Sequence, residues 1–166
     1  MTAVATHKVC LLGDFGVGKT SLVARFVRNT FSEKYLTTVG VKVDTRELAV
    51  AGKPVKLVVW DIAGRSSLDT LDRNYLRGAT GILLVCDGTR EATFRSALYL
   101  QMESRSVLGE VPAVLMINKL DLAERWEVTP VMAAEMRKTL PVFETSALTG
   151  DGVEAAFAAL AGAIVK

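Results

Sequence analysis

The sequence lacks most of the features that mark disulfide-stabilised, metal-binding or disordered proteins. It has two cysteines, Cys10 and Cys86, which lie far apart, and a single histidine. This excludes a disulfide framework or a zinc knuckle and favours a reducing compartment, with both thiols buried in the core. The four prolines form no linker-like run, and half of the residues are apolar at a net charge of +2, which excludes a disordered chain.

Long apolar runs and an excess of basic charge are also missing. No run approaches the roughly 18 residues of a membrane span, and residues 1–9 lack the apolar core of a signal peptide. The 20 basic residues are nearly balanced by 18 acidic ones, so we expect no nucleic-acid partner. We therefore expect a single cytoplasmic domain over residues 1–166.

What the sequence does contain is a regular alternation of short apolar runs and helical patterns. Runs rich in branched residues predict strands at residues 9–13, 55–61, 81–87 and 113–118. Between residues 41 and 60, two strand patterns flank Ala51-Gly52-Lys53 and predict a β-hairpin. The expected fold is α/β, a mostly parallel sheet of about six strands with one antiparallel hairpin strand and helices on both faces.

Helical periodicity falls between the strand patterns. Residues 19–29 separate apolar from basic side chains, and residues 153–164 carry one apolar stripe. Asp151 is the expected N-cap of the last helix, and Thr129 followed by Pro130 is typical of another helix start. In such folds ligands bind beyond the carboxyl ends of the strands, where the polar motifs of this sequence lie.

The strongest motif lies between the first predicted strand and the first predicted helix. Residues 13–20 read G-D-F-G-V-G-K-T and match the phosphate-loop pattern G-x-x-x-x-G-K-S/T, which predicts a P-loop NTPase fold. The glycines allow the backbone to curl so that its N–H groups face phosphate oxygens. The Lys19 ammonium suits the β- and γ-phosphates, and the Thr20 hydroxyl suits Mg²⁺.

Three weaker motifs follow other strands. The Asp61 carboxylate suits the water shell of Mg²⁺, and the backbone N–H of Gly64 suits a hydrogen bond to a γ-phosphate. In residues 118–121, N-K-L-D, the carboxylate of Asp121 can accept both guanine N–H groups, whereas adenine would leave it facing a lone pair. Residues 144–147, E-T-S-A, offer small side chains and N–H groups to the base oxygen.

The four motifs, in this order and spacing, resemble the Ras superfamily of small GTP-binding proteins, and the Rab branch most closely. Residues 35–41 are similar to the first Rab switch, and residues 60–64 and 75–82 to the second switch and the segment after it. The resemblance covers nearly the whole chain. It implies a molecular switch that cycles between GTP and GDP, with Mg²⁺ as cofactor, to control partner binding.

The resemblance also implies roles for single residues. Phe31 would lie near guanine, with a core position as the alternative, and Tyr35 would cover the phosphates. Thr38 would place its hydroxyl on Mg²⁺ and its backbone near the γ-phosphate. Trp60 and Tyr75 would be exposed aromatics that partners contact, with ordinary half-buried packing as the alternative.

The site implied in this way has three overlapping sets of residues. The nucleotide-binding set is Gly13, Asp14, Phe15, Gly16, Val17, Gly18, Lys19, Thr20, Ser21, Phe31, Tyr35, Thr38, Gly64, Asn118, Lys119, Asp121, Ser146, Ala147 and Leu148. The metal-binding set is Thr20, Thr38 and Asp61, and the catalytic set is Lys19, Thr38, Gly64 and Arg65. An effector, an exchange factor and a GTPase-activating protein would contact residues 31–45 and 60–77.

Two residues depart from the family pattern at the catalytic centre. Arg65 stands where the family usually has the Gln that orients the attacking water, and Phe15 stands where it favours a small residue. Arginine has no acceptor for a hydrogen bond from water, and the ring would obstruct an arginine finger, which contributes roughly 10³ to 10⁵ in rate. We therefore expect slow hydrolysis. Leu148 replaces a common Lys and predicts a modest loss of nucleotide affinity.

Several alternatives stay open. The chain could be a hydrolysis-deficient GTP-binding interaction module, or Arg65 could act as an arginine finger supplied in cis, or it could be a solvated loop residue. The guanine motifs disfavour a small-molecule kinase. The sequence ends at Lys166 without a cysteine-bearing tail, so we expect no direct membrane anchor in this chain, unless a tail lies outside this sequence.

Overall fold

The computed structural model describes residues 4–31 and 40–166. Its centre is a six-stranded sheet in the order β2-β3-β1-β4-β5-β6. The strands are β1 (Ala5–Gly13), β2 (Val41–Val50), β3 (Lys53–Ile62), β4 (Gly81–Asp87), β5 (Ala113–Asn118) and β6 (Val142–Glu144). Only the pair of β2 and β3 is antiparallel among these described strands, which confirms the predicted fold class.

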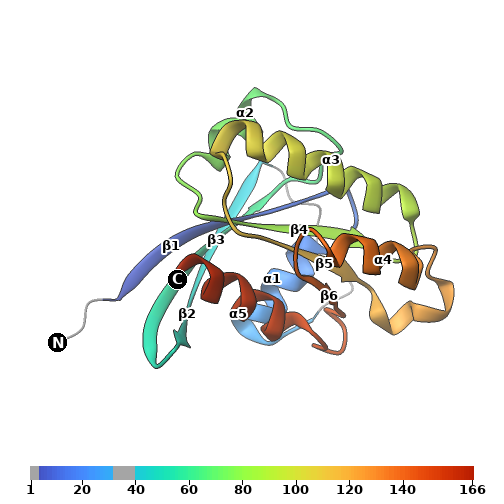
Figure 1. Ribbon diagram of the computed structural model, residues 1–166. Helices are drawn as coiled ribbons and strands as arrows, with labels where there is room; N and C mark the ends of the chain where they lie inside the picture. The colour runs from blue at the N-terminus through green and yellow to red at the C-terminus, as the bar shows by residue number, and fades with distance from the viewer. Residues whose placement is uncertain (1–3, 32–39) are drawn as a thin grey trace.

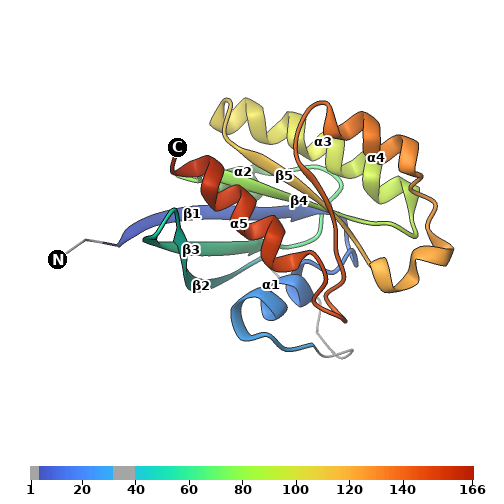
Figure 2. The same ribbon diagram turned by 60° about the horizontal axis from the view of Figure 1, so that its bottom comes forward.

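Helices cover both faces of the sheet (Figures 1 and 2). They are α1 (Lys19–Arg28), α2 (Thr70–Leu76), α3 (Glu91–Leu108), α4 (Pro130–Arg137) and α5 (Val153–Ile164), together with a 3-10 helix, η1 (Leu120–Arg125). Helices α1 and α5 contribute to the core on one face, and α2, α3 and α4 to the core on the other. Within the described residues, no helix combines the length and the apolar character needed to span a membrane.

The sheet separates two apolar cores because successive strand residues point to opposite faces. In β1, Leu11 faces the core beneath α1 and α5, whereas Cys10 faces the core beneath α2 and α3. Strand β4 is buried along its whole length, as the apolar run at residues 81–87 predicts. On the first face, Phe26 of α1 stacks on Phe157 of α5 with ring centroids 3.8 Å apart.

The predicted hairpin and one predicted helix start are both present. Ala51 and Gly52, with φ of 52° and 78°, form the turn between β2 and β3, and such positive φ values are what a two-residue hairpin turn requires. Helix α4 begins at Pro130, and the Thr129 hydroxyl caps it by accepting the backbone N–H of Met132 at 3.2 Å.

The prediction that Asp151 caps the last helix is wrong. Helix α5 is capped by Gly152, which has a φ of 73°. A Cβ at this position would lie 2.2 Å from the carbonyl oxygen of Glu144, so neither the conformation nor the space admits another residue. The close approach of β6 therefore decides where this helix begins.

Candidate functional site

The phosphate loop connects β1 to α1 at the carboxyl end of the sheet. Gly16 and Gly18 take φ values of 74° and 100°, which disfavour residues with a side chain. Gly18 is also the N-cap of α1, so no side chain caps the first N–H groups of the helix. These N–H groups and the helix dipole suit an anion such as a phosphate. A Cβ at Gly13 would lie 2.5 Å from the carbonyl oxygen of Val85, so this glycine permits close packing on β4.

Lys19 lies inside the loop and is only 6% exposed. Its Nζ donates to the carbonyl oxygen of Gly13 at 3.4 Å. Burial lowers the pKa of the Lys19 ammonium, and the negative charges of Asp61 and Asp14 oppose this shift. Burying a cation costs free energy that a bound phosphate would offset, so the electrostatics of the loop favour an anionic ligand.

Thr20 and Asp61 bring two hard oxygen donors together. The Thr20 hydroxyl donates to Oδ2 of Asp61 at 2.6 Å, and Asp61 is fully buried near the end of β3. Hydroxyl and carboxylate oxygens are typical Mg²⁺ ligands, so this pair fits the expected ion. Among the described residues, no three His, Cys, Asp or Glu side chains form a group that could hold a metal ion. The other predicted ligand, Thr38, lies outside the described residues, as does Tyr35.

The two motifs predicted to recognise the base meet beside the phosphate loop. Asn118 donates from Nδ2 to the carbonyl oxygen of Val17 at 3.0 Å, and its Oδ1 accepts the Thr145 hydroxyl at 3.1 Å. Asp121 is exposed, and its Oδ1 accepts the Ser146 hydroxyl at 2.7 Å. The bond from Ser146 orients the Asp121 carboxylate, which stays solvent-accessible, as a carboxylate that accepts from guanine would need to be.

Lys119 is held by residues that the sequence alone did not suggest. Its Nζ lies 2.8 Å from Oδ2 of the buried Asp87, at the end of β4. The indole N–H of Trp126 donates to the Lys119 carbonyl oxygen at 2.8 Å, and a Cβ at Gly88 would lie 2.2 Å from the Trp126 ring. Asp87 ends an apolar strand just as Asp61 does, and that shared position is the signal that could have marked it.

Arg25 of α1 is a second residue that sequence reasoning missed. Its Nε donates to the carbonyl oxygen of Ala147 at 2.9 Å, and its Nη2 donates to that of Leu148 at 2.7 Å. Ala147 is buried, whereas the Leu148 side chain is exposed. Arg25 therefore fastens the last predicted base loop to the helix that follows the phosphate loop.

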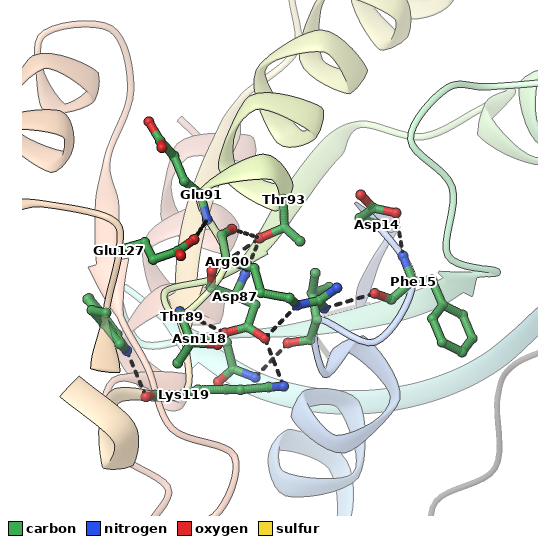
Figure 3. A network of polar contacts seen from close by, with 12 residues as sticks. Asp14, Phe15, Asp87, Thr89, Arg90, Glu91, Thr93, Asn118, Lys119 and Glu127 are labelled. Atoms are coloured by element: carbon green, nitrogen blue, oxygen red, sulfur yellow. Dashed lines mark hydrogen bonds and ion pairs between the residues drawn. The ribbon is translucent and has the colours of Figure 1, made fainter. Parts of the chain in front are cut away.

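Gly64 lies directly against the phosphate loop. A Cβ at Gly64 would lie 2.6 Å from the Cα atom of Phe15, and the backbone N–H of Arg65 donates to the Gly13 carbonyl oxygen at 3.0 Å. Phe15 itself is 58% exposed. Its backbone N–H donates to Oδ1 of Asp14 at 2.8 Å, and its ring turns away from the polar network of the site (Figure 3).

The Arg65 side chain extends toward α2. Its Nε lies 3.3 Å from Oδ2 of Asp72, and its Nη2 lies 3.8 Å from Oδ2 of Asp69. The same two aspartates form the capping box that starts α2, because each accepts the backbone N–H of the other. Burial raises the pKa of Asp72, and the neighbouring Arg65 guanidinium opposes that rise.

Helix α2 is also fastened to α3. Glu103 of α3 accepts the backbone N–H of Leu68 at 3.0 Å and the Arg73 guanidinium at 2.8 Å. The segment that follows Gly64 is therefore held at its start by the backbone bond from Arg65 to Gly13, and at α2 by the contacts with Glu103.

The aromatic residues expected near this segment pack into the fold. Trp60 and Tyr75 are half-buried against the core, with ring centroids 6.2 Å apart, so the expectation of exposed aromatics is wrong and the alternative of half-buried packing holds. Tyr75 packs there because α2 lies on the sheet. Phe31 packs partly buried against the core on the α1 side, in agreement with its alternative position.

A phosphate loop before a helix, an oxygen pair suited to Mg²⁺ and the Asn118 of an N-K-L-D motif bonded to the loop define a P-loop protein whose site fits a guanine nucleotide. Comparison with known proteins agrees. The model of the Ras family matches residues 8–166. Ras-related protein Rab-13 from Canis lupus familiaris is 36% identical over 157 residues, which cover 93% of this chain and 77% of that protein.

The chain therefore belongs to the Ras family and is Rab-like. Membership makes it a GTP-binding switch protein with the GTPase activity and the effector, exchange-factor and activator interactions that are general to the family. Arg65 and Phe15 are the residues at which this chain departs from the family pattern near the catalytic centre.

Proposed function

We propose that this protein is a guanine-nucleotide switch with slow intrinsic GTP hydrolysis, in which Arg65 stabilises α2 and does not contact the γ-phosphate. The observation that carries this proposal is the pairing of the Arg65 guanidinium with Asp72 and Asp69. A guanidinium whose charge is neutralised by carboxylates is a poor arginine finger, and it has no acceptor with which to orient water.

The phosphate loop would hold the nucleotide through its N–H groups and Lys19, and Asn118 and Asp121 would hold the base. Thr20 and Asp61 would hold Mg²⁺, directly or through water, and the ion would neutralise phosphate charge. The backbone of Phe15 packs against Gly64 and its side chain is exposed, and a large exposed side chain on the phosphate loop supports restricted access for an activator's arginine.

Residues 60–77 would form a partner-binding surface together with residues 31–45. Leu71 of α2 is 51% exposed, whereas the helix beneath it is fixed to Glu103, so α2 presents an apolar side chain from a restrained support. A restrained surface lowers the entropy lost on binding. We further propose a cytoplasmic location, because both cysteines are free thiols.

Single-turnover hydrolysis tests the proposal. The wild-type protein, loaded with GTP and Mg²⁺, should convert GTP at or below about 10⁻⁴ s⁻¹. The double variant Arg65→Gln, Phe15→Gly should be at least about tenfold faster, because it restores a water-orienting amide and opens the loop. Arg105→Ala, which removes an exposed guanidinium paired with Glu110, is the matched control.

Three outcomes would contradict the proposal. An unchanged rate in the double variant would show that these two positions do not limit hydrolysis. A large loss of rate in Arg65→Ala would instead support an arginine finger supplied in cis. GTP retained on the purified protein through the whole measurement, with unchanged partner binding, would favour a non-hydrolysing interaction module.

A further inference from the structure

Arg90 joins two parts of the nucleotide site that lie far apart in the sequence. It is in the loop between β4 and α3, where its Nε donates to Oδ2 of Asp87 at 3.1 Å. Its Nη2 donates to the carbonyl oxygen of Phe15, in the phosphate loop, at 3.0 Å. Figure 3 shows the guanidinium between these two groups. One planar side chain therefore holds a carboxylate and a backbone carbonyl at once.

The carboxylate of Asp87 is the centre of this network. It is 1% exposed and also contacts the Lys119 ammonium at 2.8 Å and accepts the Thr89 hydroxyl at 2.6 Å. Although burial alone would raise the pKa of Asp87, the hydrogen bonds from Lys119, Thr89 and Arg90 hold it below its usual value. The network thus links a residue of the guanine motif to the phosphate loop through a charged, buried group (Figure 3).

A second bridge runs parallel to the first. Asn118, the neighbour of Lys119, donates to the carbonyl oxygen of Val17 at 3.0 Å. The two loop carbonyls that receive these bonds, those of Phe15 and Val17, belong to the peptide units that precede Gly16 and Gly18. In a trans peptide unit the C=O and the following N–H point in opposite directions. Each bridge therefore directs a glycine N–H away from the bridging side chain.

We propose that Arg90 is a positioning residue for nucleotide binding, which orients the Gly16 N–H of the phosphate loop by holding the Phe15 carbonyl against Asp87. The proposal rests on guanine-nucleotide binding at this site. Without Arg90 the peptide unit between Phe15 and Gly16 can rotate. Nucleotide binding must then order this unit, at a cost in conformational entropy. Loss of Arg90 then raises the dissociation rate of GDP and of GTP by the same factor.

The dissociation of a fluorescent GDP analogue, chased by excess GDP, measures this effect. Arg90→Ala should release the analogue about tenfold faster, which corresponds to about 1.4 kcal/mol. Arg90→Lys should be intermediate, because a single ammonium replaces the planar fork that spans two acceptors. The matched control is Arg95→Ala in α3, the helix that begins directly after Arg90, since the Arg95 side chain is 74% exposed and pairs with Glu91. It should release the analogue at the wild-type rate.

Further readouts separate positioning from stability and from catalysis. The melting temperature of Arg90→Ala in the nucleotide-saturated state should lie about 3–6 °C below that of Arg95→Ala, which is the shift that tenfold weaker nucleotide binding alone produces, and single-turnover hydrolysis should change less than twofold. Equal dissociation rates for Arg90→Ala and Arg95→Ala would overturn the proposal, as would a loss of hydrolysis rate with unchanged dissociation. Rapid hydrolysis by the wild-type protein would contradict the proposed slow hydrolysis. The role of Arg90 could still be tested, because dissociation of the GDP analogue does not depend on the hydrolysis rate.

Discussion

Removing the Arg65 side chain should loosen α2 and leave hydrolysis unchanged. In the structure the guanidinium contacts the Asp72 carboxylate at 3.3 Å, and this carboxylate is 2% exposed. Asp72 also accepts the backbone N–H of Asp69 in the capping box. Arg65→Ala therefore leaves a buried charge with less compensation at the first turn of a seven-residue helix.

The size of the effect follows from exposure. A hydrogen bond to a charged group contributes about 1.5–3 kcal/mol when buried, but the Arg65 side chain is 45% exposed, so roughly half of this is expected. The contact with Asp69, spaced i to i+4 and 54% exposed, adds about 0.3 kcal/mol. The free energy of local opening of α2 should therefore fall by about 1–2 kcal/mol, which is roughly a tenfold increase in amide exchange.

Hydrogen exchange of residues 68–77 in the GDP-bound protein measures this opening. A double-mutant cycle with Asp72→Asn isolates the pair, because the asparagine oxygen can still accept the Asp69 N–H and carries no charge. In the Asp72→Asn background, Arg65→Ala should change exchange by less than about twofold. We expect the Glu103 contacts with Leu68 and Arg73 to stay intact in all four proteins of the cycle, because neither substitution touches them.

The pH dependence gives an independent check. Because burial raises the pKa of Asp72, the native state binds its proton more tightly than the unfolded chain does. Its contribution to stability is therefore complete below about pH 3.9 and is lost as the pH rises through the raised native pKa. Asp72→Asn should remove this decline, and Arg65→Ala should extend it to higher pH, as measured by urea unfolding across the acidic range.

One result would refute this role for Arg65. If Arg65→Ala slowed single-turnover hydrolysis tenfold or more and left α2 exchange unchanged, the guanidinium would act on the phosphate and its contacts with Asp69 and Asp72 would be incidental.

Other features of the fold give sharp expectations. Gly18→Ala should destabilise the protein by about 2–4 kcal/mol, because a Cβ there would lie 2.4 Å from Nδ2 of Asn118 at a φ of 100°. Gly52→Ala, with a φ of 78° and no atom within 4 Å, should cost only about 1 kcal/mol in the same urea titration, and equal costs would contradict the role of Asn118. Burial raises the pKa of Cys10 and of Cys86 to about 12, so thiol reagents at pH 8 should label them at the rate of global unfolding. Labelling that outpaces unfolding would show that the cores open locally.

Much of the fold could be predicted because its signals are local. The apolar run at residues 81–87 becomes a fully buried strand, and the turn at Ala51-Gly52 becomes the hairpin. The phosphate-loop pattern is similarly self-contained, since its glycines set the backbone and its lysine and threonine follow at fixed spacing. These features depend on neighbours within a few residues.

Helix α3 shows why the sequence did not predict every element of the fold. It is the longest helix among the described residues, yet the side chain of its N-cap residue, Arg90, makes no capping bond, and the backbone N–H of Glu91 is accepted by the distant Glu127 at 2.8 Å. Its buried face uses Ala97 beside Phe94, whereas Tyr99 and Met102 are exposed, so the apolar stripe is blurred. The position of α3 is decided by the sheet beneath it and not by its own periodicity.

The contacts that organise the site are also long-range. Arg90 and Phe15 are 75 positions apart, and the pairing of Arg25 with Ala147 spans 122. The Asp151 prediction failed for the same reason, because the close approach of β6 to Gly152 is invisible in the sequence. Sequence motifs could identify groups that would touch a ligand, but not the groups that hold them.

The two arginines beside the phosphate loop share one arrangement, and it bears on the chemistry. Arg65 donates through Nε to Asp72, and Arg90 donates through Nε to Asp87, and both carboxylates are buried. Each guanidinium is thus paired with a buried carboxylate, on an arginine side chain that is itself 45% exposed. The positive charge left to face a nucleotide comes from Lys19, the loop N–H groups and any bound Mg²⁺. On this basis we expect faster hydrolysis by the unchanged protein to need an arginine from a partner, and that arginine would have to approach a phosphate loop that carries the exposed Phe15 side chain.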